Sequence, residues 1–194
     1  EFTLSEAMRT RPLWLMLAAQ SIASLASGTT GFHLRAAIID GGFSPVLAAA
    51  CITAYSGAGA FSSALWGYLA ERFSERSLAI MLSTGASLAL VLVLTAGSAV
   101  TVLAASLAYG LTARNEYSLL NLLIANYYGR RAYGAITGFV APCSMVALGI
   151  APLVGAVVHD ILGSYDRLFM VLMALHLVTA ALLSLVQPPR PPGA

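Results

Sequence analysis

Hydrophobic residues in this chain gather into six long runs that are separated by short polar breaks. An α-helix needs about 20 residues to cross a bilayer, and each run has roughly that length or more. Ser44 followed by Pro45 is typical of a helix start, and Asp40-Gly41-Gly42 before it is typical of a turn. The pattern predicts an all-α membrane protein with six transmembrane helices: Leu13–His33, Pro45–Ala70, Ser77–Gly97, Ser98–Tyr128, Ala132–His159 and Leu168–Val186.

Composition supports a membrane protein. Hydrophobic residues make up 59% of the 194 residues and charged residues only 9%, whereas a soluble domain carries about 25% charged residues. Six helices with short loops leave no room for a second domain. We therefore expect one six-helix domain over 1–194, with a cytoplasmic lead-in over 1–12, a helical bundle over 13–187 and a cytoplasmic tail over 188–194.

Arginine placement predicts the orientation, because cytoplasmic loops are enriched in basic residues. With a cytoplasmic N-terminus, only Arg35 and Arg167 fall on the outer side. Both termini are then cytoplasmic, and we expect a multi-pass protein of a bacterial inner membrane. The predicted cytoplasmic ends hold Arg9, Arg11, Arg72, Arg76, Arg130, Arg131 and Arg190.

The sequence contains no lysine, and this narrows the chemistry. A Walker A phosphate loop and a Schiff-base enzyme both require lysine, so any pumping by this chain must draw on an ion gradient or another subunit. We expect no cofactor and no nucleic-acid partner. Cys51 and Cys143 fall within apolar runs and are interpreted as two buried thiols.

The fourth apolar run is interrupted by Arg114-Asn115-Glu116. Each ionised side chain at mid-bilayer depth costs about 2.5–3.5 kcal/mol, so such residues usually face a protein interior or a watery cavity. On an ideal helix Arg114 and Glu116 lie about 200° apart and cannot pair along one face. Arg114 would share its stripe with Ser118 and Asn121.

We hypothesise that Arg114 holds an anionic group and that Glu116, on a stripe with Thr112 and Tyr109, is a protonatable coupling site. Arginine stays charged and can bind a carboxylate with two hydrogen bonds. A carboxylate withdrawn from water can bind and release a proton near neutral pH. A static ion pair with neighbouring helices is the alternative, and the sequence leaves both open.

Polar and small residues mark one face of several other helices. In the first helix Gln20, Ser24, Ser27 and Gly31 share a face, and the second helix is similarly small and polar. The third and sixth helices are apolar, which predicts a three-plus-three inverted repeat with these two outside; His176 in the sixth is interpreted as packing. The candidate substrate or coupling residues are Gln20, Ser24, Tyr55, Arg114, Asn115, Glu116 and Asn121.

The segment Gly67–Arg76, with its glycine, Glu71-Arg72 pair and further arginine, resembles the loop signature of the major facilitator superfamily. The lead-in Thr3–Trp14 is similar to the run before the seventh helix of monocarboxylate and oxalate/formate-type members. Other segments similar to these members are Phe32-His33-Leu34, Gly42–Pro45, Asn126–Gly134 and Gly163–Tyr165.

The resemblance implies that the chain is the C-terminal half of a twelve-helix secondary transporter. It implies a small-molecule solute, a lipid bilayer and the N-terminal six-helix half as partners, and a cavity bordered by the first, second, fourth and fifth helices. The loop residues Gly67, Glu71, Arg72 and Arg76 would then form a gate, by capping a neighbouring helix and holding one conformation closed.

One position departs from the family pattern. Many anion-carrying relatives place an arginine about four residues before the loop glycine, where this chain has Ser62-Ser63. Either Arg114 takes that role or the solute is not an anion.

Three other classes of protein are alternatives to a secondary transporter. An intramembrane serine protease would use Ser56 in Ala54–Gly57, but that segment lacks the first glycine of a Gly-x-Ser-Gly site. A metalloenzyme is disfavoured because His33, His159 and His176 lack metal-ligand spacing, so no metal is expected. A complete six-helix carrier or scaffold that works as a homo-oligomer stays open.

Overall fold

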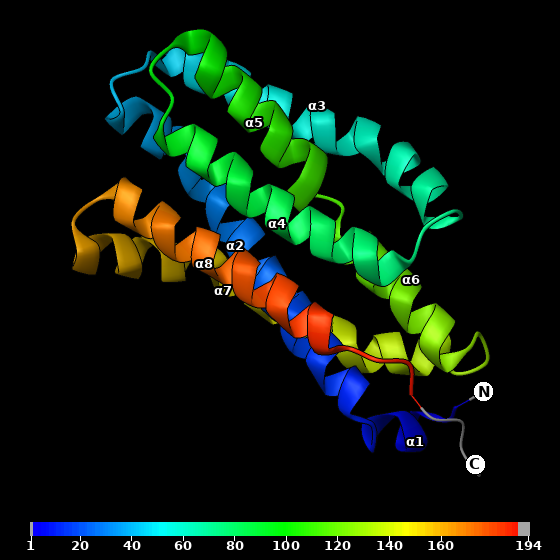
Figure 1. Cartoon of the computed structure of the whole chain (residues 1–194). Helices are drawn as coiled ribbons and strands as arrows, with labels where there is room; N and C mark the ends of the chain where they lie inside the picture. Colours follow the sequence, from blue (N-terminus) through cyan, green and yellow to red (C-terminus); the bar gives the residue numbers. More distant parts are fainter. Residues whose placement is uncertain (1, 190–194) are drawn as a thin grey trace.

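The structure is a computed structural model that describes residues 2–189, and these residues form a bundle of helices without strands (Figure 1). Arg190, one of the arginines used to predict the orientation, lies outside the described residues together with the rest of the predicted tail beyond Pro189. The helices are α1 (Leu4–Met8), α2 (Arg11–Asp40), α3 (Pro45–Ala70), α4 (Glu75–Leu94), α5 (Ala99–Ala113), α6 (Glu116–Tyr128), α7 (Tyr133–Leu162) and α8 (Tyr165–Leu185).

The predicted all-α membrane architecture is confirmed. Helices α3, α4, α7 and α8 are long and apolar enough to cross a membrane. Helix α2 has 30 residues but carries the polar stripe, and α5 and α6 together occupy the fourth predicted span. The prediction of a continuous fourth helix over Ser98–Tyr128 was wrong, because the helix stops at Ala113 and restarts at Glu116.

Two other boundaries differ from the sequence prediction. Helix α2 continues to Asp40, seven residues beyond His33, because nothing in that segment breaks a helix before Gly41-Gly42. The lead-in contains α1, which begins with a capping box in which Thr3 and Glu6 bond each other reciprocally. The hydrogen bonds that Glu6 accepts from the backbone N–H and hydroxyl of Thr3 lower the pKa of that carboxyl.

Helix packing matches the predicted inverted repeat of two triplets, α2–α3–α4 and α5/α6–α7–α8. Helix α2 packs against α7 and α8, and correspondingly α5 packs against α3 and α4. Helices α4 and α8, the third members, pack against each other. Exchanging the two triplets therefore turns the contacts of α2 with α7 and α8 into those of α5 with α3 and α4, and it leaves the α4–α8 contact unchanged.

The apolar helices α4 and α8 are more buried than the sequence suggested. Each has an outward face, with Leu88 and Leu177 exposed, but each also buries a face against the other helices. The Ser87 hydroxyl on α4 donates to the Met173 carbonyl on α8 at 3.2 Å, and this bond joins the two helices. Helices α3 and α7 instead present large apolar side chains outward, including Phe61 and Leu153. Cys143 on α7 is exposed, so the interpretation of two buried thiols holds only for Cys51.

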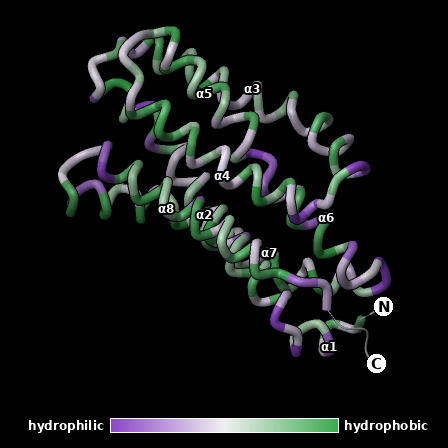
Figure 2. Tube along the Cα trace, viewed as in Figure 1, coloured by the Kyte–Doolittle hydropathy of each residue, from purple (hydrophilic) through white to green (hydrophobic). Residues whose placement is uncertain are grey.

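One end of the bundle gathers α1, the α3–α4 and α6–α7 connections and the end of α8 (Figure 1). Polar residues concentrate at the helix ends, whereas the middle of the bundle is largely apolar (Figure 2). At this end the Arg76 guanidinium donates to the carbonyls of Leu183 and Ser184, which are among the last carbonyls of α8. The described part of the chain, residues 2–189, thus begins and ends at the same end of the bundle, as an even number of spans requires.

Helices α3 and α5 approach each other closely at Gly110. A Cβ at Gly110 would collide with the carbonyl of Tyr55, whereas a Cβ at Gly57 would meet no atom within 4 Å. Small residues at such crossings let membrane helices approach closely.

We predict that Gly110→Ala destabilises the protein by about 1–3 kcal/mol, because α5 must move away from α3. Gly57→Ala is the control, and it should be neutral or stabilising because alanine favours a helix by up to about 1 kcal/mol over glycine. Thermal unfolding of the purified protein in detergent measures both. Equal melting temperatures for the two variants would contradict the close approach.

Candidate functional site

The interruption of the fourth span lies at mid-bundle depth, since the 15 residues of α5 extend roughly 22 Å from its outer end. The Asn115 N–H turns back to the Thr112 carbonyl at 3.1 Å, which tightens the last turn of α5. The Leu111 carbonyl instead accepts a hydrogen bond from Trp66 Nε1 of α3 at 2.7 Å. Helix α3 therefore supplies a donor that an unbroken helix would have supplied itself.

Asn115 is buried and holds the break against α3. Its Nδ2 donates to Ser62 Oγ at 2.7 Å, and its Oδ1 accepts from Ser63 Oγ at 2.9 Å. Asn115 is one of the predicted substrate or coupling residues; its side chain faces α3 and is not among those that line the cavity beside the break. Its hydrogen bonds to α3 position its two charged neighbours.

A cavity of about 440 Å³ opens beside the break, between α2, α3, α5, α6 and α7. Five of the predicted site residues line it: Gln20, Ser24, Tyr55, Arg114 and Glu116. Ser27, Ser56 and Tyr117 add further polar groups, and Phe32, Ile52, Leu120 and Leu148 form its apolar wall. Gln20 Oε1 and Ser27 Oγ are buried without a hydrogen-bond partner, so both remain available to a ligand.

Arg114 provides the positive charge of this cavity. Its side chain lies across Gly59 of α3, where a Cβ would come within 2.7 Å of it, and its Cζ lies 5.4 Å from the centre of the Tyr55 ring. A guanidinium over an aromatic face is held by a cation–π attraction. Among residues 2–189, no carboxylate lies within ion-pair distance of Arg114, so its charge has no partner there.

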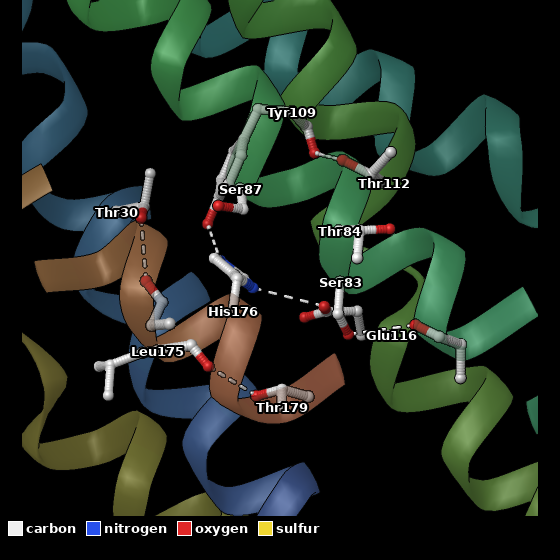
Figure 3. Close-up of polar contacts among 12 residues, drawn as sticks. Thr30, Ser83, Thr84, Ser87, Tyr109, Thr112, Glu116, Leu175, His176 and Thr179 are labelled. Atoms are coloured by element: carbon white, nitrogen blue, oxygen red, sulfur yellow. Dashed lines mark hydrogen bonds and ion pairs between the residues drawn. The ribbon is translucent and has the colours of Figure 1, made fainter. Parts of the chain in front are cut away.

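Glu116 lines the same cavity but is almost fully buried, 2% exposed. One carboxylate oxygen lies 3.4 Å from His176 Nδ1, and His176 Nε2 lies 3.0 Å from the Tyr109 hydroxyl (Figure 3). Glu116 is also the first residue of α6, where the positive end of the helix dipole favours a negative charge. Tyr109 and Glu116, which were predicted to share a stripe, thus both contact His176.

Asn121 contacts the site only indirectly. Its Oδ1 accepts from Gln20 Nε2 at 3.4 Å, and it lines a second hollow with Ser118 and Arg130 rather than the cavity that holds Arg114. The break in the helix rotates α6 relative to α5, so the stripe predicted for one continuous helix divides between two hollows.

The predicted gate residues lie together at the end of the bundle, away from this cavity. Glu71 and Arg72 are exposed, and the Arg72 guanidinium stacks over the Tyr68 ring at 4.5 Å. Arg76 caps the end of α8, as described above, and a Cβ at Gly67 would meet no atom within 4 Å. The adjacent Glu75 accepts a hydrogen bond from Asn126 of α6, a contact that the sequence analysis missed.

Ser56 borders the cavity, but none of the three histidines bonds to it within the described part of the chain. His33 contacts the Pro152 carbonyl, His159 contacts Asp160, and His176 contacts Tyr109 and Glu116. Within the described residues, no histidine is therefore placed as a base beside Ser56.

Sequence reasoning missed the partnership of His176 with Glu116. The two residues are 60 positions apart, and His176 was interpreted as packing because it stands alone in an apolar helix. The available signal was that Glu116 in the fourth span and His176 in the sixth are both titratable residues near mid-depth in largely apolar helices.

A model of the family described as "Major Facilitator Superfamily" matches residues 12–194, which is nearly the whole chain. No match was found among curated proteins. The family match agrees with the long apolar helices, the repeated triplets and the polar cavity at mid-depth. This chain therefore belongs to the Major Facilitator Superfamily, a family of integral membrane proteins that transport solutes across membranes.

Proposed function

We propose that this chain is the C-terminal half of a twelve-helix secondary transporter that carries a small organic anion, such as a monocarboxylate, together with a proton. The observation that carries this proposal is the pair of opposite charges in one cavity: Arg114 without a carboxylate partner, and Glu116, which lies within ion-pair distance of His176. Alternating access would expose this cavity to each side of the membrane in turn.

The position of Arg114 supports an anionic solute. Relatives that carry anions place an arginine on the second helix near Ser62-Ser63, which in this chain hold Asn115 instead. Arg114 approaches the same helix from the break and lies against Gly59, less than one turn from Ser62. The guanidinium thus reaches the cavity from a different helix, and it can bind a carboxylate with two hydrogen bonds.

The environment of Glu116 supports proton coupling. An ionised carboxylate in a membrane-embedded bundle is costly unless it is paired and hydrogen-bonded, and neither oxygen of Glu116 accepts a hydrogen bond. Because Glu116 also borders the cavity, a proton can reach it from the solute side. A substrate anion and a proton that arrive together would leave the cavity electrically unchanged.

The outward faces of α3 and α7 support a second half. Both helices border the cavity or its rim, yet both expose large apolar side chains such as Phe61, Met145 and Leu153. In a bilayer these faces can contact lipid or protein, and an N-terminal six-helix half would cover them and close the cavity. We also propose that both termini are cytoplasmic in a bacterial inner membrane, because the arginine-rich end of the bundle then faces the cytoplasm.

To test the anion site, we predict that Arg114→Gln in the intact transporter lowers the affinity for the solute at least tenfold, because a charge-assisted hydrogen bond contributes about 1.5–3 kcal/mol. Proteoliposomes with radiolabelled acetate, L-lactate, pyruvate, oxalate and benzoate, and glycerol as a neutral probe, measure uptake. Arg35→Gln, an exposed arginine near the outer end of α2, is the matched control. Unchanged carboxylate uptake by Arg114→Gln, or uptake of glycerol alone, would contradict an anionic solute.

To test proton coupling, we predict that Glu116→Gln abolishes uphill accumulation driven by a pH gradient but preserves exchange of internal for external carboxylate. A neutral amide can keep the packing but cannot release a proton. Asp166 carries an exposed carboxylate that does not line the cavity, so Asp166→Asn should retain both activities. Loss of exchange together with accumulation would assign Glu116 a structural role.

We also propose that the loop Gly67–Arg76 is the gate, because Arg76 ties α4 to the end of α8. Arg76→Gln should shift the balance between outward-open and inward-open states, with little change in the relative uptake of the five carboxylates. Arg131→Gln, at an exposed arginine of the same bundle end but outside this loop, is the control. Spin labels across the cytoplasmic end measure the balance, and a changed carboxylate preference would count against a gate.

A further inference from the structure

His176 is a fully buried titratable side chain that the transport proposal leaves unused. It sits near the middle of α8, is 0% exposed, and does not line the cavity. Its two ring nitrogens face two different helices: Nε2 lies 3.0 Å from the Tyr109 hydroxyl of α5, and Nδ1 lies 3.4 Å from Glu116 Oε1 of α6 (Figure 3).

Three atoms at this contact lack a hydrogen bond: both carboxylate oxygens of Glu116 and Nδ1 of His176. The distance of 3.4 Å brings the two groups within ion-pair range, although the contact does not have the geometry of a full hydrogen bond. A bare carboxylate beside a bare ring nitrogen is costly in a bundle core. One proton placed between these atoms satisfies both groups at once.

The surroundings leave this pair as the only place for that proton among the described residues at this depth. Tyr109 faces His176, and Tyr55 stacks on Tyr109 with ring centres 5.6 Å apart and an interplanar angle of 28°. Helices α2 and α4, which also pack against α8, bring hydroxyl groups such as Thr30 and Ser87 to this region (Figure 3). The titratable residues of α2, α4 and α7 lie toward the ends of these helices, among them His33, Glu75 and His159.

We propose that His176 and Glu116 together hold one proton, so that His176 is the second half of the proton site and Tyr109 is its positioning residue. With the proton on Nδ1, an imidazolium faces a carboxylate; with the proton on the carboxyl oxygen, both groups are neutral. Either way the pair has no net charge. The proton leaves to the cavity through Glu116, which borders it, and the pair is then left with one negative charge.

The shared proton rests on the proposed transport function and specifies its coupling step. When an anion occupies Arg114, the protonated pair keeps the cavity neutral. When the anion leaves, Arg114 can balance the charge of the deprotonated pair across the same cavity. The contacts from Arg114 to Tyr55, Tyr109, His176 and Glu116 form a continuous chain that joins the anion site to the proton site.

The test without any solute is the melting temperature of the purified intact transporter at pH 6 and pH 9. Loss of the shared proton at alkaline pH leaves a bare buried carboxylate, so the wild type should lose about 5 °C or more relative to the double variant Glu116→Gln/His176→Gln. His176→Gln alone keeps the carboxylate without its partner and should be less stable than the double variant already at pH 6. Thr179→Val, a buried substitution one turn along α8, should keep the wild-type pH dependence.

Equal pH dependence in the wild type, Glu116→Gln and the double variant would overturn the shared proton and leave His176 as packing. If every His176 variant fails to fold, the comparison of wild type with Glu116→Gln decides alone. Tyr109→Phe keeps the stack on Tyr55 but removes the hydroxyl, and it should shift the pH dependence toward that of His176→Gln.

Transport then separates this inference from the proposed function. With pyruvate as the probe, His176→Gln should retain exchange but lose at least tenfold in pH-driven accumulation. If pyruvate and the other carboxylates are not carried by the wild type, the anion proposal fails, whereas the melting experiment still decides whether the pair holds a proton.

Discussion

The hydrogen bonds that hold the broken fourth span against α3 are the constraint on which the rest of the site depends. A helix that stops in the middle of a bilayer leaves backbone donors and acceptors without partners, and hydrocarbon cannot supply them. Here Trp66 satisfies the Leu111 carbonyl, and Ser62 and Ser63 bond the Asn115 amide. Because the break is satisfied by protein, Arg114 and Glu116 can stand at its two sides with different surroundings.

The break also resolves a conflict that a continuous helix would impose. On one helix the two charges would point in nearly opposite directions, so one of them would face away from any cavity. Ending α5 at Ala113 and starting α6 at Glu116 brings both to the same cavity. The start of α6 also places the carboxylate at the favourable end of a helix dipole. The break thus allows two side chains of opposite charge to converge on one cavity.

Much of the fold could be predicted from the sequence, because a membrane restricts a chain to long apolar helices and leaves clear breaks between them. That Gln20, Ser24, Tyr55, Arg114 and Glu116 face the interior was also predictable, since polar groups in such helices must face protein or water. The break at Asn115 was not, because it depends on donors from α3, 52 and 53 residues away in the chain. His176 was missed for the same reason: a lone histidine acquires a role only through the residues that meet it in space.

The inverted repeat relates the two proposed sites to the movement of helices. Helices α4 and α8, the third members of the two triplets, pack against each other. His176 lies on the buried face of α8, whereas Glu116 lies on the broken fourth span. A movement that separates α6 from α8 would therefore pull the carboxylate from the imidazole without disturbing the bonds between Asn115 and α3. In the proposed proton site, Glu116 lies on α6, which borders the cavity, whereas His176 lies on α8, which does not. The proposed anion site lies only on helices that border the cavity. In the proposed mechanism, a change of charge at either site is therefore tied to relative motion of these two groups of helices, as the coupling of a proton to an anion requires.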